Sequence, residues 1–193
     1  MEITRKMKKK NIKLPLTIHT KIGKTIVFKE LIPIDGENVL IMDCFCEPGV
    51  GPDMHVHFLQ KETIKVIKGK MAYQIKGEKI KCLNVGESAT FDKGCHHRFY
   101  NAGNDELHIE ATIKPALNTV FFCSAVYEAL NNGKNGKPEP FDAAYLFLRY
   151  RKEHGASEVG WFTLNITMPI IYFIGLLLGK YKKFKDAPKP IRL

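Results

Sequence analysis

A series of short runs rich in Val, Ile, Phe and Tyr fills residues 24–113 and constrains the fold more than any other feature. Turn signals such as Lys68-Gly69-Lys70 separate the runs, which is typical of β-strands. No helical pattern interrupts the series, so the sequence predicts a mainly β protein, an antiparallel sandwich or barrel. The predicted strands cover residues 25–31, 39–46, 54–58, 63–67, 71–75, 79–83, 88–91, 97–101 and 107–113.

The pattern changes after Pro115. Apolar residues at three-and-four spacing over residues 116–131 predict a helix that ends near Gly133, and a second helical pattern covers residues 141–154. Residues before the strand-rich stretch are basic and show little periodicity. The expected organisation is a basic N-terminal tail at residues 1–20, a β-barrel at residues 21–115 and a helical extension at residues 116–193.

Residues 161–179 form an uncharged run of nineteen residues, which meets the length of a membrane span. Asn165 and Pro169 interrupt the run, and Lys and Arg are denser after it than before it, which favours a cytoplasmic C-terminus. A single span would then put the barrel outside the cell, although the sequence opens without a secretory signal. A helix packed on the barrel or on a partner subunit, or one lying in the bilayer interface, avoids this conflict. We expect one of these arrangements and keep the span as the alternative.

Charge and cysteine content argue against several classes of protein. The formal net charge is +10, but arginine, the side chain best suited to bases and phosphates, occurs only five times, and the basic excess sits at the two ends. We therefore expect solvated tails and no nucleic-acid partner. Five irregularly spaced cysteines without a C-x-x-C pair argue against a disulfide framework and a zinc finger. These features predict a cytoplasmic protein, with membrane association through residues 161–179 left open.

Residues of metal-ligating type gather inside the strand-rich stretch. His55 and His57 lie two apart on a predicted strand, so their side chains share one face. Glu62 has the opposite parity, but residues 58–61 can carry the chain round into the next strand and return its carboxylate to the same cavity. His97 offers a fourth donor. Three imidazoles and one carboxylate suit one divalent transition metal, Fe, Mn, Ni, Cu or Zn, with coordination positions left open.

Two spaced motifs carry a resemblance to the cupin superfamily. The first is G-x5-H-x-H-x(3,4)-E-x6-G and the second is G-x5-P-x-G-x2-H-x3-N. The resemblance covers about half of the chain, and the short spacing between the motifs is similar to that in small single-domain bacterial cupins. Asp92 stands where the second motif usually has proline, which alters a turn and no ligand. The other fixed positions are filled by Gly49, His55, His57, Glu62, Gly69, Gly86, Gly94, His97 and Asn101.

The resemblance implies a fold and a ligand set. The fold is a double-stranded β-helix, the jelly-roll cupin barrel, with a C-terminal helical extension. The motif register selects His97 over His96, whose side chain should point away from the metal, and Cys95 fits the register less well as a ligand. The implied metal ligands are His55, His57, Glu62 and His97. Candidates for the cavity wall are Tyr73, Phe91, Phe99 and Glu110, although ordinary barrel packing also explains the aromatic residues.

The same resemblance implies a metal-dependent, dioxygenase-like enzyme acting on a small oxygenated organic molecule, as in bacterial cupins labelled quercetin-dioxygenase-like. Glu62 can then leave the metal and act as a catalytic base. A non-catalytic ligand-binding or sensor cupin is the alternative, and isomerisation or decarboxylation also stays open, because a fold does not fix a function. We expect a homodimer, because cupin barrels commonly pair through sheet edges and the apolar C-terminal run needs cover.

Overall fold

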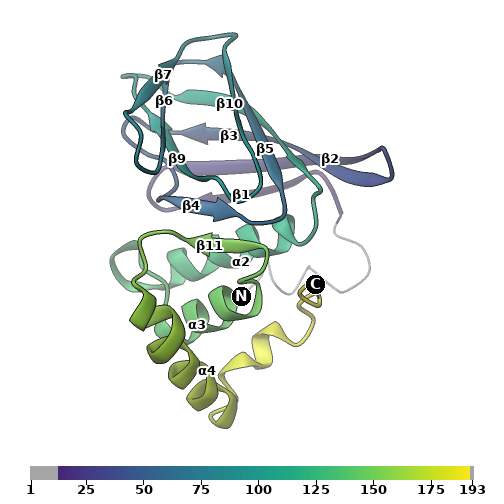
Figure 1. Ribbon diagram of the computed structural model, residues 1–193, viewed down its shortest axis with the longest axis vertical. Helices are drawn as coiled ribbons and strands as arrows, with labels where there is room; N and C mark the ends of the chain where they lie inside the picture. Colours follow the sequence, from purple (N-terminus) through teal and green to yellow (C-terminus); the bar gives the residue numbers. More distant parts are fainter. Residues whose placement is uncertain (1–12, 192–193) are drawn as a thin grey trace.

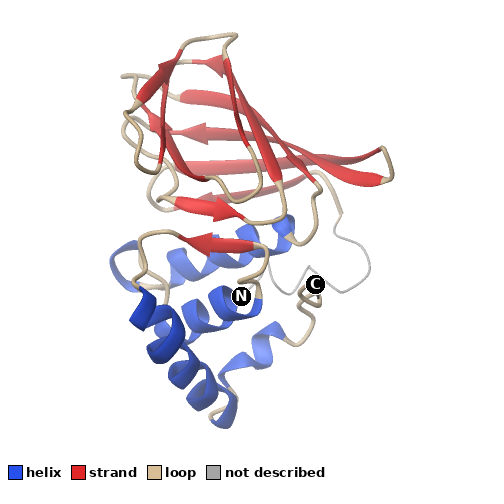
Figure 2. Cartoon of the chain, in the orientation of Figure 1, coloured by secondary structure: helices blue, strands red, loops and turns tan. Residues whose placement is uncertain are grey.

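The computed structural model describes residues 13–191. Strands fill one half of the molecule and helices the other (Figure 2), so the predicted mainly β fold with C-terminal helices is confirmed. Most of the expected basic tail, residues 1–12, lies outside the described residues. The strands are β1 (Leu16–Thr20), β2 (Lys24–Ile34), β3 (Glu37–Cys46), β4 (His55–His57), β5 (Lys61–Lys68), β6 (Met71–Ile75), β7 (Lys81–Leu83), β8 (Ser88–Phe91), β9 (His96–Asn101), β10 (Leu107–Lys114) and β11 (His154–Ala156).

Two facing antiparallel sheets make the barrel (Figure 1). The larger sheet has the strand order β1-β2-β3-β10-β5-β8, and the smaller has the order β11-β4-β9-β6-β7. Because successive side chains of a strand point to opposite faces, every second residue of β10 from Leu107 to Ile113 is buried. These side chains meet Phe28, Leu40 and Ile64 in the barrel core. The arrangement is a double-stranded β-helix.

The helical half lies beneath one end of the barrel (Figure 1). Helix α2 (Thr119–Asn132) lies nearest the strands, and its Val120 and Phe121 join the core. Helices α3 (Pro140–Arg149) and α4 (Met168–Leu177) lie farther out. The fully buried Glu153 accepts hydrogen bonds from the Asn118 side chain at 2.8 Å and from the Ile191 backbone at 3.2 Å. This carboxylate therefore holds the C-terminal segment against the start of α2.

Two strands arise where the sequence predicts none. Residues 16–20, expected in the basic tail, form β1, which pairs with β2 and buries Ile18 completely. Residues 141–154 were expected to form one helix, but α3 ends at Arg149 and β11 pairs with β4. Both strands are short, and their backbone groups gain hydrogen bonds only from a partner strand. Local periodicity carries little signal for such pairing.

Residues 161–179 form an interrupted helix. A π-helical turn at Thr163–Thr167 precedes α4, and Pro169 stands at the start of α4. Proline has no backbone N–H and its ring clashes with the carbonyl four residues earlier, and a π-turn is one of the ways in which a helix absorbs this disruption. Across residues 13–191, no helix combines the length and the apolar character that crossing a membrane requires.

Candidate metal centre

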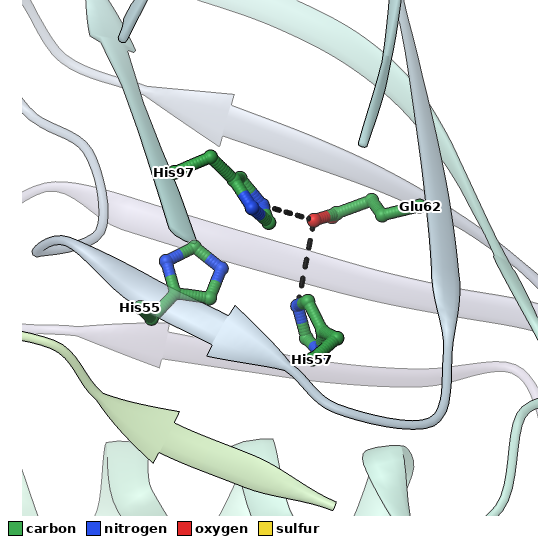
Figure 3. Close-up of side chains that lie close together, drawn as sticks. All are labelled: His55, His57, Glu62 and His97. Atoms are coloured by element: carbon green, nitrogen blue, oxygen red, sulfur yellow. Dashed lines mark hydrogen bonds and ion pairs between the residues drawn. The ribbon is translucent and has the colours of Figure 1, made fainter. Parts of the chain in front are cut away.

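Four side chains from three strands converge inside the barrel (Figure 3). His55 and His57 come from β4, Glu62 from β5 and His97 from β9. One ligand atom of each residue lies within 4.8 Å of the corresponding atoms of the other three. Strand pairing produces this cluster, because β4 and β9 are neighbours with His55 opposite His97. The structure thus brings together all four side chains that the sequence analysis selected. We call them the histidine–glutamate cluster, and it can hold a metal ion.

Glu62 is the acidic member of the cluster and is only 4% exposed. Its Oε2 atom lies 2.9 Å from His97 Nε2 and 3.4 Å from His57 Nε2. Burial by itself raises the pKa of this carboxyl, but the hydrogen bonds and charge of His57 and His97 outweigh burial and hold the pKa well below its usual range. Glu62 is therefore an ionised carboxylate that needs a positive partner in the core.

In two histidines of the cluster, the ring nitrogen Nδ1 is anchored to the backbone. His55 Nδ1 lies 2.8 Å from the Asp53 carbonyl oxygen, and His97 Nδ1 lies 2.9 Å from the Cys95 carbonyl oxygen. A carbonyl only accepts, so each Nδ1–H donates, and Nε2 is left to face the cluster. Burial, followed by the neighbouring His57 and His97, lowers the pKa of His55 well below its usual value. His55 is therefore neutral, as a metal ligand must be.

His154 holds the third imidazole of the cluster, that of His57, and the sequence analysis did not select it. Its Nδ1 lies 3.2 Å from His57 Nδ1, and its ring stacks on Phe122 with centroids 4.2 Å apart. Burial, with His57 and His55 nearby, lowers the pKa of His154 well below its usual value, so the neutral ring can accept the His57 Nδ1–H. His154 belongs to β11, which pairs directly with β4. The predicted helix over residues 141–154 concealed this role.

The hydrogen-bond partners of the three Nδ1 atoms indicate whether the cluster fits a metal ion. Hydrogen bonds to outer partners fix the tautomer and orientation of ligating imidazoles in known metal sites. Here such partners serve all three imidazoles, and the buried carboxylate supplies negative charge. A set of nitrogen and oxygen donors of this kind suits a divalent transition metal. The donor chemistry therefore fits, and it does not choose among Fe, Mn, Ni, Cu and Zn.

Aromatic side chains form part of the wall around the cluster. Phe91 stacks on His97 with ring centroids 4.0 Å apart, and Tyr73 meets Phe91 edge-on at 5.6 Å. Phe99 is buried in the same barrel core. The prediction that Glu110 lines the cavity is wrong. Glu110 occupies an outward-facing position of β10, and its carboxylate pairs with Lys29 of β2 at 2.8 Å. Strand parity explains the difference, since Ile109 and Ala111 on either side of Glu110 point inward.

His96 lies on the opposite face of β9 from His97. Its Nδ1 atom is 2.7 Å from Ser157 Oγ, and its ring lines an outer cleft of about 430 Å³. Cys95 contributes its backbone carbonyl to His97, and its thiol is not part of the four-residue cluster. The alternation of side chains along β9 thus separates the two neighbouring imidazoles, as the strand register predicts.

The remaining motif residues shape turns. Asn101 is buried, and its Nδ2 donates to the carbonyls of Cys46 at 2.8 Å and Asp105 at 2.7 Å, while its Oδ1 accepts from Gly103 N. Asn101 therefore ties together the end of β3 and the turn after β9. The four motif glycines have positive φ angles between 77° and 90°, which side chains disfavour. They are Gly49, Gly69, Gly86 and Gly94.

Comparison with solved structures finds similar barrels at low sequence identity. An uncharacterised conserved protein with a double-stranded β-helix domain from Klebsiella pneumoniae is 18% identical, with a TM-score of 0.46 over 52% of this chain and 84% of that one. KdgF from a Halomonas species is 15% identical, with a TM-score of 0.47 over 54% of this chain and 92% of that one. An RmlC-like cupin from Shewanella frigidimarina is 16% identical, with a TM-score of 0.45 over 55% and 89%.

A comparison with curated proteins finds no match. A scan against protein-family models matches residues 44–113 to the cupin domain. These residues contain both motifs, all four members of the histidine–glutamate cluster and strands β4 to β9 of the barrel. The match therefore identifies residues 44–113 as a cupin domain.

Proposed function

We propose that this cupin domain is a metal-dependent, dioxygenase-like enzyme that acts on a small oxygenated organic molecule. The observation that carries the proposal is the histidine–glutamate cluster, in which each imidazole has an Nδ1 partner and a buried carboxylate faces His57 and His97. His55, His57, Glu62 and His97 would hold the metal. A bound divalent metal with open positions supplies Lewis acidity and sites for O₂ and a substrate oxygen.

Two residues of the cluster have roles beyond ligation. Glu62 is the carboxylate of the cluster and is ionised, so it is the group that can accept a proton from a substrate hydroxyl. His55 is the partly exposed member of the four, so a substrate would approach the cluster from its side. Phe91 is buried and stacks on His97, so it shields that imidazole from water.

Metal analysis followed by O₂ consumption tests the proposal. The purified protein is stripped, loaded separately with Fe(II), Mn(II), Ni(II), Cu(II) or Zn(II), and screened in an oxygen electrode against flavonols, diols and keto acids. We expect about one metal per chain and O₂ uptake with one substrate class. Glu62→Gln should lose uptake, whereas His96→Ala, a matched change on the other face of β9, should keep it.

The screen also separates the rival function. Tight binding of a small molecule, measured by calorimetry, with no O₂ uptake and no change in the molecule would favour a ligand-binding or sensor cupin. Conversion of a substrate without O₂ uptake would favour isomerase or decarboxylase chemistry. Either outcome contradicts the dioxygenase-like activity, and loss of all metal binding contradicts the metal-dependent part.

A further inference from the structure

The helical stretch at residues 161–177 presents an unbroken apolar face to solvent. Its exposed side chains recur at helical spacing, and each is at least 40% exposed. Phe173 is 61% exposed and Leu177 is 73% exposed, values that are high for large apolar side chains. We call this face the apolar stripe, and it consists of Phe162, Ile166, Ile170, Phe173, Ile174 and Leu177.

The other face of the same helix is firmly packed, so the exposure of the stripe does not come from a loose helix. Met168 and Gly175 are buried. A side chain at Gly175 would collide with the ring of Tyr181, which packs directly on the helix. Tyr172 stacks on Tyr181 with centroids 5.0 Å apart and on Tyr145 of α3 at 6.2 Å. These contacts fix the rotation of α4 and leave the apolar stripe exposed to solvent. Helix α4 itself lies at the end of the molecule remote from the barrel (Figure 1).

Basic side chains flank the stripe at both ends. Lys182 and Lys185 are exposed just after the helix. Arg151 and Lys152 are exposed and line the outer cleft together with Leu164, at the beginning of the helix. The nearby acidic groups are fewer: Asp142 is paired with Lys183 at 2.5 Å, and the exposed Glu158 and the half-buried Asp186 remain. The surroundings of the apolar stripe are therefore net positive.

We propose that the apolar stripe is a membrane docking surface that lies in the interface of an anionic bilayer, parallel to its plane. An apolar helix face bordered by Lys and Arg is the arrangement that binds such a surface, because lipid tails take the apolar side chains and headgroups attract the cations. Trp161, 71% exposed at the start of the helix, is a residue type enriched at membrane interfaces.

Charge argues for a bilayer over a second copy of the chain as the occupant. The protein carries a formal net charge of +10. Two copies joined through the stripe would bring Lys182 and Lys185 of one close to the basic residues of the other, at a contact with few acidic residues to compensate. An anionic surface turns the same charges into attraction. This inference depends on neither the metal nor the proposed function.

Trp161 is the only tryptophan of the chain and provides the readout. The full-length protein is mixed with vesicles of phosphatidylcholine alone or with about 30% phosphatidylglycerol, which makes the surface anionic, and Trp161 emission and co-sedimentation are recorded. We expect a blue shift, protection from acrylamide and co-sedimentation with the anionic vesicles at low salt. High salt should release most of the protein, because the headgroup attraction is screened.

Paired variants locate the binding surface. Leu177→Glu should lower the partition coefficient at least tenfold, whereas Val85→Glu, a change at a similarly exposed apolar residue of the barrel, should leave it unchanged. Lys182→Gln with Lys185→Gln should weaken binding about five-fold per charge. Lys68→Gln with Lys79→Gln removes the same charge from the barrel surface and should have little effect. All of these positions are exposed, so melting temperatures should stay close to the parent.

Three outcomes would overturn the proposal. The first is unchanged Trp161 emission with no co-sedimentation on anionic vesicles at low salt. The second is a blue shift that rises with protein concentration without vesicles and disappears in Leu177→Glu, which would identify a second copy as the occupant. The third is equal vesicle binding by Leu177→Glu and Val85→Glu, which would place the binding surface elsewhere.

Discussion

His57 is the residue on which the cluster depends most, because it contacts both Glu62 and His154. Replacement of His57 by Ala removes one donor and leaves the carboxylate without one of its two imidazole partners. We expect metal content, measured by elemental analysis after purification, to fall severely in His57→Ala. His96→Ala should keep its metal, since His96 bonds to Ser157 outside the barrel. Metal loss in His96→Ala together with retention in His97→Ala would reverse our assignment.

We expect His154 to contribute to metal affinity without being one of the four proposed ligands. Outer partners of ligating histidines typically change metal affinity about 10- to 100-fold when removed. We therefore expect His154→Ala to weaken metal binding by about this factor in a chelator competition titration. His154→Gln keeps an acceptor oxygen and should recover part of the affinity. His19→Ala, at an exposed position of β1, is the control. If His154→Ala and His19→Ala bind metal with equal affinity, His154 does not position His57.

The buried neutral imidazole of His154 makes the metal-free protein sensitive to acid. Its folded pKa lies well below its usual value, so the unfolded chain binds a proton near pH 6.5 that the folded chain does not. The contribution of this residue to stability is fully present above pH 6.5 and declines as the pH falls below it. From pH 7.5 to 5.5 this residue should reduce the free energy of unfolding, by an amount on the order of 1 kcal/mol.

Urea titrations of the metal-free protein at the two pH values measure this loss. The decrease in the free energy of unfolding should be smaller in His154→Gln than in the parent, by roughly 1 kcal/mol. His19→Gln should behave like the parent, because His19 is exposed. Equal pH slopes for the parent and His154→Gln would show that His154 is not held neutral.

At the scale of elements, the loop between β3 and β4 crosses β9. This crossing decides where β4, the strand of His55 and His57, begins. A side chain at Gly51 would meet the carbonyl oxygen of Phe99 and the backbone of Tyr100. The loop is also bonded to β9, with Asn101 N donating to Val50 O at 3.0 Å. Glycine at position 51 therefore lets two backbones touch just before His55.

Gly51→Ala tests this crossing. Because backbone atoms cannot move aside as a flexible side chain can, we expect a loss of about 1–3 kcal/mol in the free energy of unfolding, the range typical of overpacking. Gly160→Ala, where an added methyl group meets nothing within 4 Å, should change stability little. Urea denaturation of both variants gives the comparison. A neutral Gly51→Ala would mean that the loop can move away from β9.

At the scale of the whole molecule, we propose a homodimer that forms through a sheet edge. Among the described residues, β1 is one of the two outer strands of the six-stranded sheet, and outer strands offer backbone groups for pairing. Light scattering at micromolar concentration without detergent should therefore give about twice the chain mass of 22.0 kDa. The dimer should persist in Leu177→Glu, because the apolar stripe is not its interface. A monomer mass in the parent would contradict the expectation.

The sequence by itself predicted the parts of this protein that depend on short-range order. Strand alternation and motif spacing selected His55, His57, Glu62 and His97 and separated His97 from His96, because both signals repeat within a few residues. The change of period after Pro115 likewise indicated where strands give way to helices. The same local signals assigned Glu110 to the cavity wall as a candidate, and the observed parity of β10 excluded it.

Only the tertiary structure decided what depends on contacts between distant segments. The pairing of β11 with β4, nearly a hundred residues away, places His154 against His57, and no periodicity marks a three-residue strand. The packing of Tyr181 on Gly175 decides which side of an almost wholly apolar helix faces outward. In both cases, contact with another segment of the chain decides which face is buried. The pattern of neighbouring residues in the sequence carries no information about that contact.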